Sequence, residues 1–211
     1  MAYEGLTQDD LDNVRALNAV WLELDGRMDG VGHRLTAGCR ERLAAAPFLL
    51  FSFREHDGDW WAWLLDERRQ QDLLAGVPQS PDGLHGLHGL HGLQVAAFAF
   101  LWEMSRRNPY VARLVTGAPV DWCELIASVT LVHALERIAG HETIEARFVN
   151  DTSRLARLCR RGASALPETR RSAQLSALQA MLRRSNDKQH GGLPAAACRM
   201  AVPARRAADE L

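Results

Sequence analysis

The chain has 211 residues, of which 47% are hydrophobic, and a formal net charge of −1, so it is long enough for one large domain or two small ones with real cores. No apolar run approaches the roughly 18 residues of a membrane span, and the first thirty residues carry acids where a signal peptide would carry bases. We therefore expect a globular protein with no membrane partner and, as the default, a cytoplasmic location. The cysteines are scattered, with no CxxC pair and no histidine at ligand spacing, so we expect neither a zinc knuckle nor a disulfide scaffold: Cys39, Cys123, Cys159 and Cys198.

The first predicted element is an amphipathic helix. Thr7 and Asp10 form a capping-box pattern at its start, and Gly30 and Gly32 end it. Apolar residues follow at spacings of three and four, which predicts a narrow, coiled-coil-like seam: Val14, Leu17, Trp21, Leu24 and Met28. A second, short helix is expected over residues 36–46, because Pro47 cannot continue it.

An aromatic strand and a tryptophan-rich helix come next. Residues 48–53 are apolar almost throughout, which in six residues favours a strand. Asp59 is expected to cap a helix that runs to about Leu74. That helix carries three tryptophans, of which we expect two in the core and one at an interface: Trp60, Trp61 and Trp63.

Residues 76–93 differ in kind from their surroundings. Glycines and prolines break regular structure, and GLH then repeats with a period of three, which fits neither a helix nor a strand. We interpret this tract as a low-complexity linker. His85, His88 and His91 could form a loose metal chelate, but repeat expansion in a tolerant loop is favoured because no carboxylate or thiol is held beside them. No metal or cofactor is therefore predicted.

A helix that is apolar nearly all round is expected over residues 93–107, and a short segment, 110–115, follows Pro109 and ends at Gly117. Two further helices, 119–127 and 131–139, have the lengths and the short connection of a helix-turn-helix, with Thr130 as N-cap of the second.

The second of these helices would be the DNA reader. Its polar residues are few: His133, Glu136 and Arg137. This is a poor set for base edges, so a packing hairpin stays equally open.

The last third contains a second strand, 143–148, and helices 153–161 and 167–184; everything after Ser185 is expected to be disordered. A stripe of leucines marks the last helix: Leu175, Leu178 and Leu182.

This third is also basic. From Thr152 to the end, 12 basic residues face 4 acidic ones, a net charge of +8 against −9 for the rest. Such a segment can contact nucleic acid or an acidic partner, although a solvated helix face with a basic tail explains the counts as well. The candidates for DNA contact are Arg154, Arg157, Arg160, Arg161, Arg170 and Arg171, with His133 and Arg137 from the reading helix.

No catalytic constellation stands out. The sequence contains no phosphate loop and no HExxH motif, and four histidines have no Ser, Cys or Asp partner in a recognisable pattern: His33, His56, His133 and His141. Asp57 and Asp59 beside His56 could suggest a metal loop, but the intervening Gly58 favours a turn before a helix. We therefore expect a protein that is not an enzyme.

Two stretches echo each other. ERLAAAPFLLFSFREHDGDWWAWLL begins at Glu41 and ERIAGHETIEARFVNDTSRLARL begins at Glu136, and in each the end of a helix leads to a short strand, a polar turn and a new helix. The echo indicates a tandem duplication, so that one chain would contain two subunit-like repeats in a pseudo-symmetric dimer.

The order of these elements resembles the D subunit of the bacterial flagellar master transcriptional regulator, the FlhD family. The second repeat carries the resemblance through AFLWEMSRRNPYVARLVTG, ELIASVTLVHALERIAG and EARFVNDTSRLARLC, and the first through LNAVWLELDGRM and RERLAAAPFLLFSFREHDGDWWAWLL. The first repeat is shorter, since GVGHRLTAG replaces a helix and the hairpin. The resemblance implies an all-helical dimer that binds promoter DNA with a zinc-containing FlhC-like subunit. The family's intersubunit cysteine has no equivalent, because Phe51 and Ile144 stand near its place.

We therefore expect a mainly α fold of two FlhD-like repeats, divided as 1–75 (first repeat), 76–93 (linker), 94–162 (second repeat), 163–186 (C-terminal helix) and 187–211 (disordered tail). Strand 49–54 should pair antiparallel with strand 143–148, above the two long helices. The expected pseudo-dimer interface comprises Val14, Leu17, Trp21, Leu24, Leu50, Phe51, Phe98, Trp102 and Ile144.

The expected function is transcriptional regulation, with motility genes as the targets that the family resemblance implies, through DNA or through a DNA-binding partner. The alternative is a protein-interaction module without DNA contact, in which the tryptophan-rich first repeat binds another protein.

Overall fold

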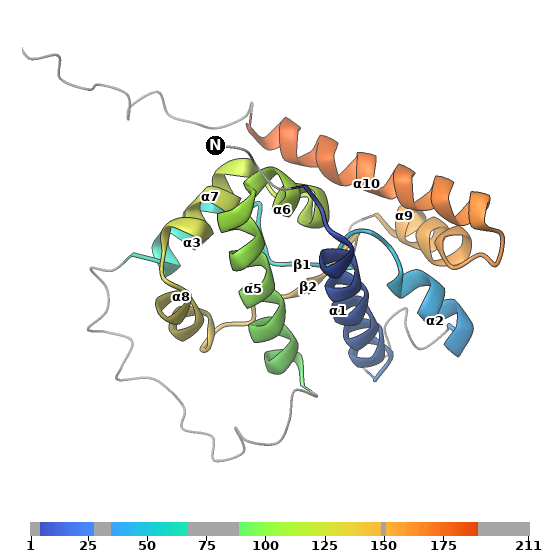
Figure 1. Ribbon diagram of the computed structural model, residues 1–211, viewed down its shortest axis with the longest axis horizontal. Coiled ribbons are helices and arrows are strands. Elements are labelled where there is room, and N and C mark those ends of the chain that lie inside the picture. Colours follow the sequence, from blue (N-terminus) through green and yellow to red (C-terminus); the bar gives the residue numbers. More distant parts are fainter. Residues whose placement is uncertain (1–4, 28–34, 67–88, 149–150, 190–211) are drawn as a thin grey trace, which may run out of the picture.

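The computed structural model describes residues 5–27, 35–66, 89–148 and 151–189, and this part of the chain is mainly helical with one small sheet (Figure 1). The prediction of a mainly α fold is confirmed. Two long helices, α1 (Gln8–Arg27) and α5 (Leu90–Arg107), pack against each other at the centre, and the other elements surround them. Among the described residues, no helix is both long and apolar enough to cross a membrane.

Helix α1 begins at the predicted capping box. The Thr7 hydroxyl accepts a hydrogen bond from the Asp10 amide (3.1 Å), and the Asp10 carboxylate accepts one from the Thr7 amide (2.9 Å). Asp10 also accepts from Arg107 at the end of α5, with an N–O distance of 2.6 Å. The start of α1 is thereby fastened to the end of its neighbour.

The two paired strands are much shorter than predicted. Strand β1 (Phe51–Ser52) pairs antiparallel with β2 (Glu145–Ala146), with Phe51 opposite Ala146 and Ser52 opposite Glu145. The predicted antiparallel pairing is confirmed. The strands are short because the backbone just before β1 bonds elsewhere: the Leu49 amide donates to the Val115 carbonyl, at 2.9 Å.

A buried amide holds the chain before β1. Helix α2 (Ala37–Ala44) packs on α1, and from α1 the side chain of Asn18 donates to the carbonyls of Ala44 (3.2 Å) and Phe48 (2.9 Å) and accepts from the Leu50 amide (2.8 Å). Asn18 therefore ties the end of α2 to the start of β1.

A second buried amide does the same before β2. From α5, the side chain of Gln94 donates to the carbonyls of Ile138 and His141, each at 2.9 Å, and accepts from the Thr143 amide at 3.0 Å. Gln94 thus ties the end of α8 (Leu131–Ile138) to the start of β2. We call Asn18 and Gln94 the two amide clamps.

Helix α3 (Gly58–Leu64) is capped by Asp57, whose carboxylate accepts from the Trp60 amide at 3.2 Å. The prediction of Asp59 as the cap is wrong, because Asp59 lies inside the first turn. Trp61 is fully buried, Trp60 is half-buried and Trp63 is 41% exposed, as expected for two tryptophans in the core and one outside it.

The predicted end of α3 near Leu74, and His85 and His88 of the GLH tract, lie outside the described residues. Helix α5 begins at Leu90, inside the predicted linker, so the linker's expected end at residue 93 is wrong. From Leu93 onward, this helix directs apolar residues toward the core, which stabilises it as a helix. The helical structure extends back from there to Leu90, so Leu90 to Gly92 are part of it.

The helices after α5 follow the prediction closely. Helix α6 (Pro109–Thr116) ends at Gly117, which adopts the left-handed conformation (φ 69°) that glycine accommodates. Helix α7 (Val120–Ser128) and α8 are joined by the predicted short connection, but both pack mainly on α5 rather than on each other, so they do not form a packing hairpin. The Thr130 hydroxyl caps α8 by accepting from the His133 amide at 3.3 Å.

The C-terminal part contains α9 (Thr152–Arg157), which continues directly as a π-helical turn, η3 (Leu158–Gly162), and then α10 (Pro167–Gln189). Since α10 reaches Gln189, the predicted boundaries at residues 184 and 186 are wrong; residues 190–211 lie outside the described part.

The expected leucine stripe of α10 is not its packing face. Leu175 is 53% exposed, and the helix instead buries Ala173, Ala177 and Met181 against η3 and α6. Met181 packs directly against Gly117: a Cβ added at Gly117 would lie 2.8 Å from the Met181 Cβ, so glycine is required at that position.

One hydrophobic core joins both halves of the chain. Trp61 stacks on Phe98 with 5.9 Å between ring centroids, and Phe53 contacts the same ring edge-on at 6.2 Å. The expected interface residues all belong to this core or pack against it: Val14, Trp21, Leu24, Leu50, Phe51, Phe98 and Ile144 are buried, and Leu17 and Trp102 are half-buried.

Candidate functional site

After the two strands, the described residues share a left-handed residue and a closing hydrogen bond. Each strand is soon followed by a residue in the left-handed conformation, Arg54 (φ 54°) after β1 and Phe148 (φ 64°) after β2. Three residues later an aspartate amide donates back to that residue's carbonyl, at 2.9 Å in both Asp57 and Asp151. Each aspartate then caps the next helix. We call residues 51–60 the first strand–turn segment and residues 145–154 the second.

A cation–aromatic contact recurs in both segments with the two partners exchanged. In the first, the guanidinium of Arg54 lies over the Trp60 ring, 4.6 Å from its centroid. In the second, the guanidinium of Arg154 lies 5.8 Å from the centroid of Phe148. The arginine occupies the left-handed position in one segment and the helix position in the other.

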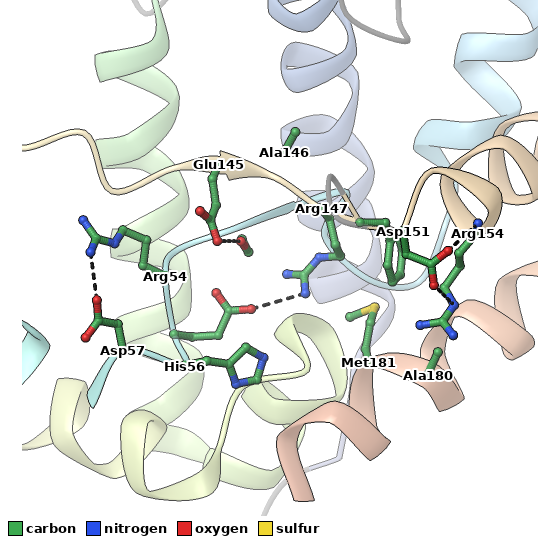
Figure 2. A pocket seen from close by; sticks show the side chains of 13 residues that line it. Arg54, His56, Asp57, Glu145, Ala146, Arg147, Asp151, Arg154, Ala180 and Met181 are labelled. Carbon is green, nitrogen blue, oxygen red and sulfur yellow. Dashed lines mark hydrogen bonds and ion pairs between the residues drawn. The ribbon is translucent and has the colours of Figure 1, made fainter. Parts of the chain in front are cut away.

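Between the two segments lies a pocket of about 760 Å³ (Figure 2). Its sides carry the Arg54–Asp57 pair (2.8 Å) and the Arg154–Asp151 pair (3.4 Å), and Ala180 and Met181 of α10 form a further wall.

A buried ion pair crosses from one segment to the other inside this pocket. Arg147 donates to the Glu55 carboxylate at 3.2 Å and to the Phe51 carbonyl at 2.6 Å, and Glu55 accepts from the Phe53 amide at 2.6 Å. The side chains of Arg147 and Glu55 are 8% and 1% exposed. Each of the three arginines that line the pocket is thus paired with a carboxylate, and a fourth carboxylate, Glu145, accepts from the Ser52 hydroxyl at 3.0 Å.

The electrostatics of the outer pair favour the ionised form of Asp151. Its carboxylate accepts a hydrogen bond from the Arg154 amide (2.9 Å) and from the Ser153 hydroxyl (3.0 Å), and these bonds lower its pKa. This charge also lies at the N-terminus of α9, where the helix dipole favours an anion.

Helices α7 and α8 do not present the residues expected of a DNA reader. Arg137 is only 6% exposed and donates to the Asp66 carbonyl at 2.9 Å, so its assignment as a DNA contact is wrong. This hydrogen bond instead connects α8 to the chain that follows α3. His133 is half-buried. The exposed charged side chains between residues 119 and 142 are all carboxylates: Asp121, Glu124, Glu136 and Glu142.

The predicted arginine cluster falls into two groups. Arg157, Arg160 and Arg161 on α9 and η3, with Arg171 on α10, are exposed, and the described part of the chain places no carboxylate within ion-pair distance of them. Arg154 and Arg170 are less exposed and already engaged, Arg154 with Asp151 and Arg170 with the Ser164 carbonyl (2.9 Å). We call Arg157, Arg160 and Arg161 the arginine face.

The arginine face is held on a firmly packed support. The Arg42 side chain of α2 donates to the Ala163 carbonyl at 2.8 Å. A Cβ added at Gly162 would lie 2.9 Å from the Cδ1 of Leu158 in the same turn, so glycine leaves room for that buried side chain. The hydrogen bond from Arg42 joins the turn that carries the arginines to α2.

The described cysteines are free thiols with distinct surroundings. Burial raises the pKa of Cys123 to about 12 and that of Cys159 to about 11. A hydrogen bond with Thr36, followed by the nearby Arg42, lowers the pKa of Cys39. No three His, Cys, Asp or Glu side chains of the described ranges gather as a metal site would require.

Sequence reasoning missed the amide clamps and Glu55. The signal for Asn18 was available, since this polar residue stands between Val14 and Trp21 on the apolar seam of α1. Glu55 gave no such signal, because its partner Arg147 is distant in the sequence.

No protein-family model matches the chain, and no curated protein or solved structure is significantly similar to it.

Proposed function

We propose that this protein is a non-enzymatic transcriptional regulator that contacts the phosphates of promoter DNA through the arginine face. The observation that carries the proposal is the exposure of Arg157, Arg160 and Arg161 on one rigid turn. Guanidinium groups without a carboxylate partner in the described structure are available to phosphate oxygens. The acidic exposed surface of α7–α8 would repel the DNA backbone and so orients the protein with this turn toward the duplex.

The proposed architecture is a tandem of FlhD-like repeats that form an intramolecular pseudo-dimer. Three recurring features support it: the amide clamps, the left-handed residues and the aspartate caps. The two strand–turn segments, which carry the left-handed residues and the aspartate caps, pair across β1 and β2 in opposite directions, as a local twofold arrangement requires. By the same resemblance, an FlhC-like subunit would be the partner on DNA, motility genes the targets and the cytoplasm the location.

A binding titration with duplex DNA tests the phosphate contact. The triple variant Arg157→Ala/Arg160→Ala/Arg161→Ala should bind far more weakly, and the slope of log affinity against log salt should become shallower by about 0.9 for each phosphate that the variant no longer neutralises. The matched control removes three arginines from elsewhere: Arg15→Ala/Arg106→Ala/Arg113→Ala.

Fluorescence anisotropy across a salt series gives both quantities. Equal weakening in the two triple variants would show that only net charge matters and would refute the arginine face. Absence of DNA affinity in the wild-type protein, both alone and with co-purifying partners, would refute the regulator itself.

A protein-interaction module without DNA contact is the second candidate, and the outward-facing Trp63 and the carboxylates of α7–α8 favour it. It predicts that one partner lacking DNA affinity dominates a pull-down, and that Trp63→Ala or Glu136→Arg abolishes its capture while the arginine-face triple variant does not.

A further inference from the structure

Two parts of the described chain carry exposed charge of opposite sign. Between residues 119 and 142 the exposed charges are carboxylates, whereas residues 152–183 contain seven arginines and one glutamate, a net charge of +6. Figure 1 places α8 and α10 on opposite sides of the central helices α1 and α5. The two surfaces therefore cannot neutralise each other within one molecule.

An exposed apolar side chain lies in each of these surfaces. On α8, Val132 is 67% exposed and stands one turn before Glu136. On α10, Leu175 is 53% exposed and stands one turn after Arg171. Apolar residues surrounded by charge have the anatomy of a protein–protein interface, with a dry centre and a polar rim.

Helix α10 leaves the face that carries Leu175 exposed. Its inner face buries Ala173, Ala177 and Met181, and the half-buried Leu178 packs at the edge of the core. Leu182 is also half-buried, and Leu175 is the exposed member of this leucine stripe. Pairing of two α10 helices would bring Arg171 and Arg183 of both copies together, so like-charge repulsion disfavours it.

We propose that copies of this protein associate head to tail, with the outer stripe of α10 docking on α8 of the next copy. Leu175 packs against Val132 at the centre, and Arg171 and Arg183 face the acidic surface that includes Glu136. Because the two surfaces differ and lie on opposite sides, the contact is heterologous and repeats into an open chain. This association goes beyond the proposed DNA contact and does not use the arginine face.

Sedimentation velocity of the full chain without DNA tests the association. Over roughly 5 to 200 µM in low salt, a range suited to micromolar contacts, the weight-average mass should rise at least about twofold. It should return to the monomer value near 0.5 M salt, where charges are screened within a few ångströms. A monomer at every concentration, or an assembly indifferent to salt, would overturn the proposal.

Two charge-reversal variants make the test specific. Arg171→Glu/Arg183→Glu makes the α10 surface acidic. Asp121→Arg/Glu124→Arg/Glu136→Arg makes the α7–α8 surface basic, because three of its four exposed carboxylates become arginines. Each variant alone should stay monomeric, and an equimolar mixture of the two should associate again, because each then offers the complement of the other. Circular dichroism checks that both fold.

Single apolar variants decide between assembly modes. Leu175→Asp and Val132→Asp should both abolish association, and the arginine-face triple variant should leave it unchanged. If Val132→Asp associates like the wild type while Leu175→Asp does not, α10 pairs with itself and the head-to-tail contact is overturned. Loss of DNA binding with intact association would refute only the proposed function, and the reverse result only this inference.

Discussion

The two strand–turn segments share a backbone but use it for different purposes. In the first, the turn after Arg54 leads into α3, which inserts Trp61 completely into the core. In the second, the equivalent turn after Phe148 leads into α9, none of whose six residues is buried. Similar turns therefore lead into a helix that packs in the core in the first half and into a helix that exposes arginines in the second.

The exchange of arginine and aromatic ring between the segments explains how this is possible. The left-handed position and the helix position face each other, so either can carry the cation as long as the other carries the ring. The contact is present in both segments, while the helix that follows buries Trp61 in the first and carries exposed basic side chains in the second.

The largest expected effect comes from the ion pair that links the segments. Arg147→Met should lower the free energy of unfolding by about 3–5 kcal/mol, because it leaves the buried Glu55 carboxylate without its counter-charge. The double variant Arg147→Met/Glu55→Gln should recover part of this loss, since glutamine still accepts from Phe53. Urea unfolding measures all three, with the exposed Glu145→Gln as the control. A loss below about 1 kcal/mol in Arg147→Met would mean that the segments are not coupled through this pair.

Variants of the two amide clamps test whether the clamps contribute equally to the free energy of unfolding, as their similar geometry suggests. Asn18→Leu and Gln94→Leu each remove three hydrogen bonds to backbone groups, at about 1 kcal/mol per bond, so both should cost about 3 kcal/mol in urea unfolding. Ser105→Ala, a buried polar residue on α5 outside the clamps, serves as the comparison. Markedly unequal losses would break the equivalence.

Glycine substitutions at the two left-handed positions should change the stability by different amounts in the two segments. Arg54→Gly should change stability by less than about 1 kcal/mol, because relief of the left-handed conformation offsets the loss of an exposed ion pair. Phe148→Gly should cost about 3 kcal/mol, since a buried ring is deleted. Thermal unfolding of both variants gives the difference, and equal effects would contradict the assigned roles.

The smallest expected effect is a dependence on pH. Hydrogen bonds lower the pKa of Asp151, and those from Arg107 and Thr7 outweigh burial to lower the pKa of Asp10. Both carboxylates therefore stabilise the fold above their ordinary value of 3.8, and this contribution is lost as the pH falls through the lowered values. Asp10→Asn and Asp151→Asn should each flatten the loss of stability in urea unfolding between about pH 5 and pH 3. Asp121→Asn, on the exposed side of α7, should keep the wild-type slope.

Helix ends and strand pairing could be predicted because their signals are local or repeated. Thr7 with Asp10, Thr130 and Gly117 each act within one turn of their position, so neighbouring residues suffice to identify all three. The pairing of β1 with β2 follows from the echo of the two sequences.

The errors arose where tertiary contacts decide the outcome. Leu175 follows the leucine period of α10, yet the helix turns Ala173, Ala177 and Met181 inward, with Met181 against Gly117. Arginine is usually a surface residue, but Arg137 is buried because its side chain supplies the hydrogen-bond donor for the Asp66 carbonyl. At the candidate site, the arginine face was visible as a basic periodicity, whereas the buried Arg147–Glu55 pair depends on a distant contact.

The pairing of β1 with β2 also has a consequence for the order of events during synthesis. Ser52 and Glu145 are 93 positions apart, so the first strand leaves the ribosome several seconds before its partner at ordinary elongation rates. During that interval Asn18 can already bond the start of β1, while the backbone groups of the strand that face β2 have no partner yet. We expect the first half to form a loosely organised nascent intermediate whose completion is timed by translation of the second.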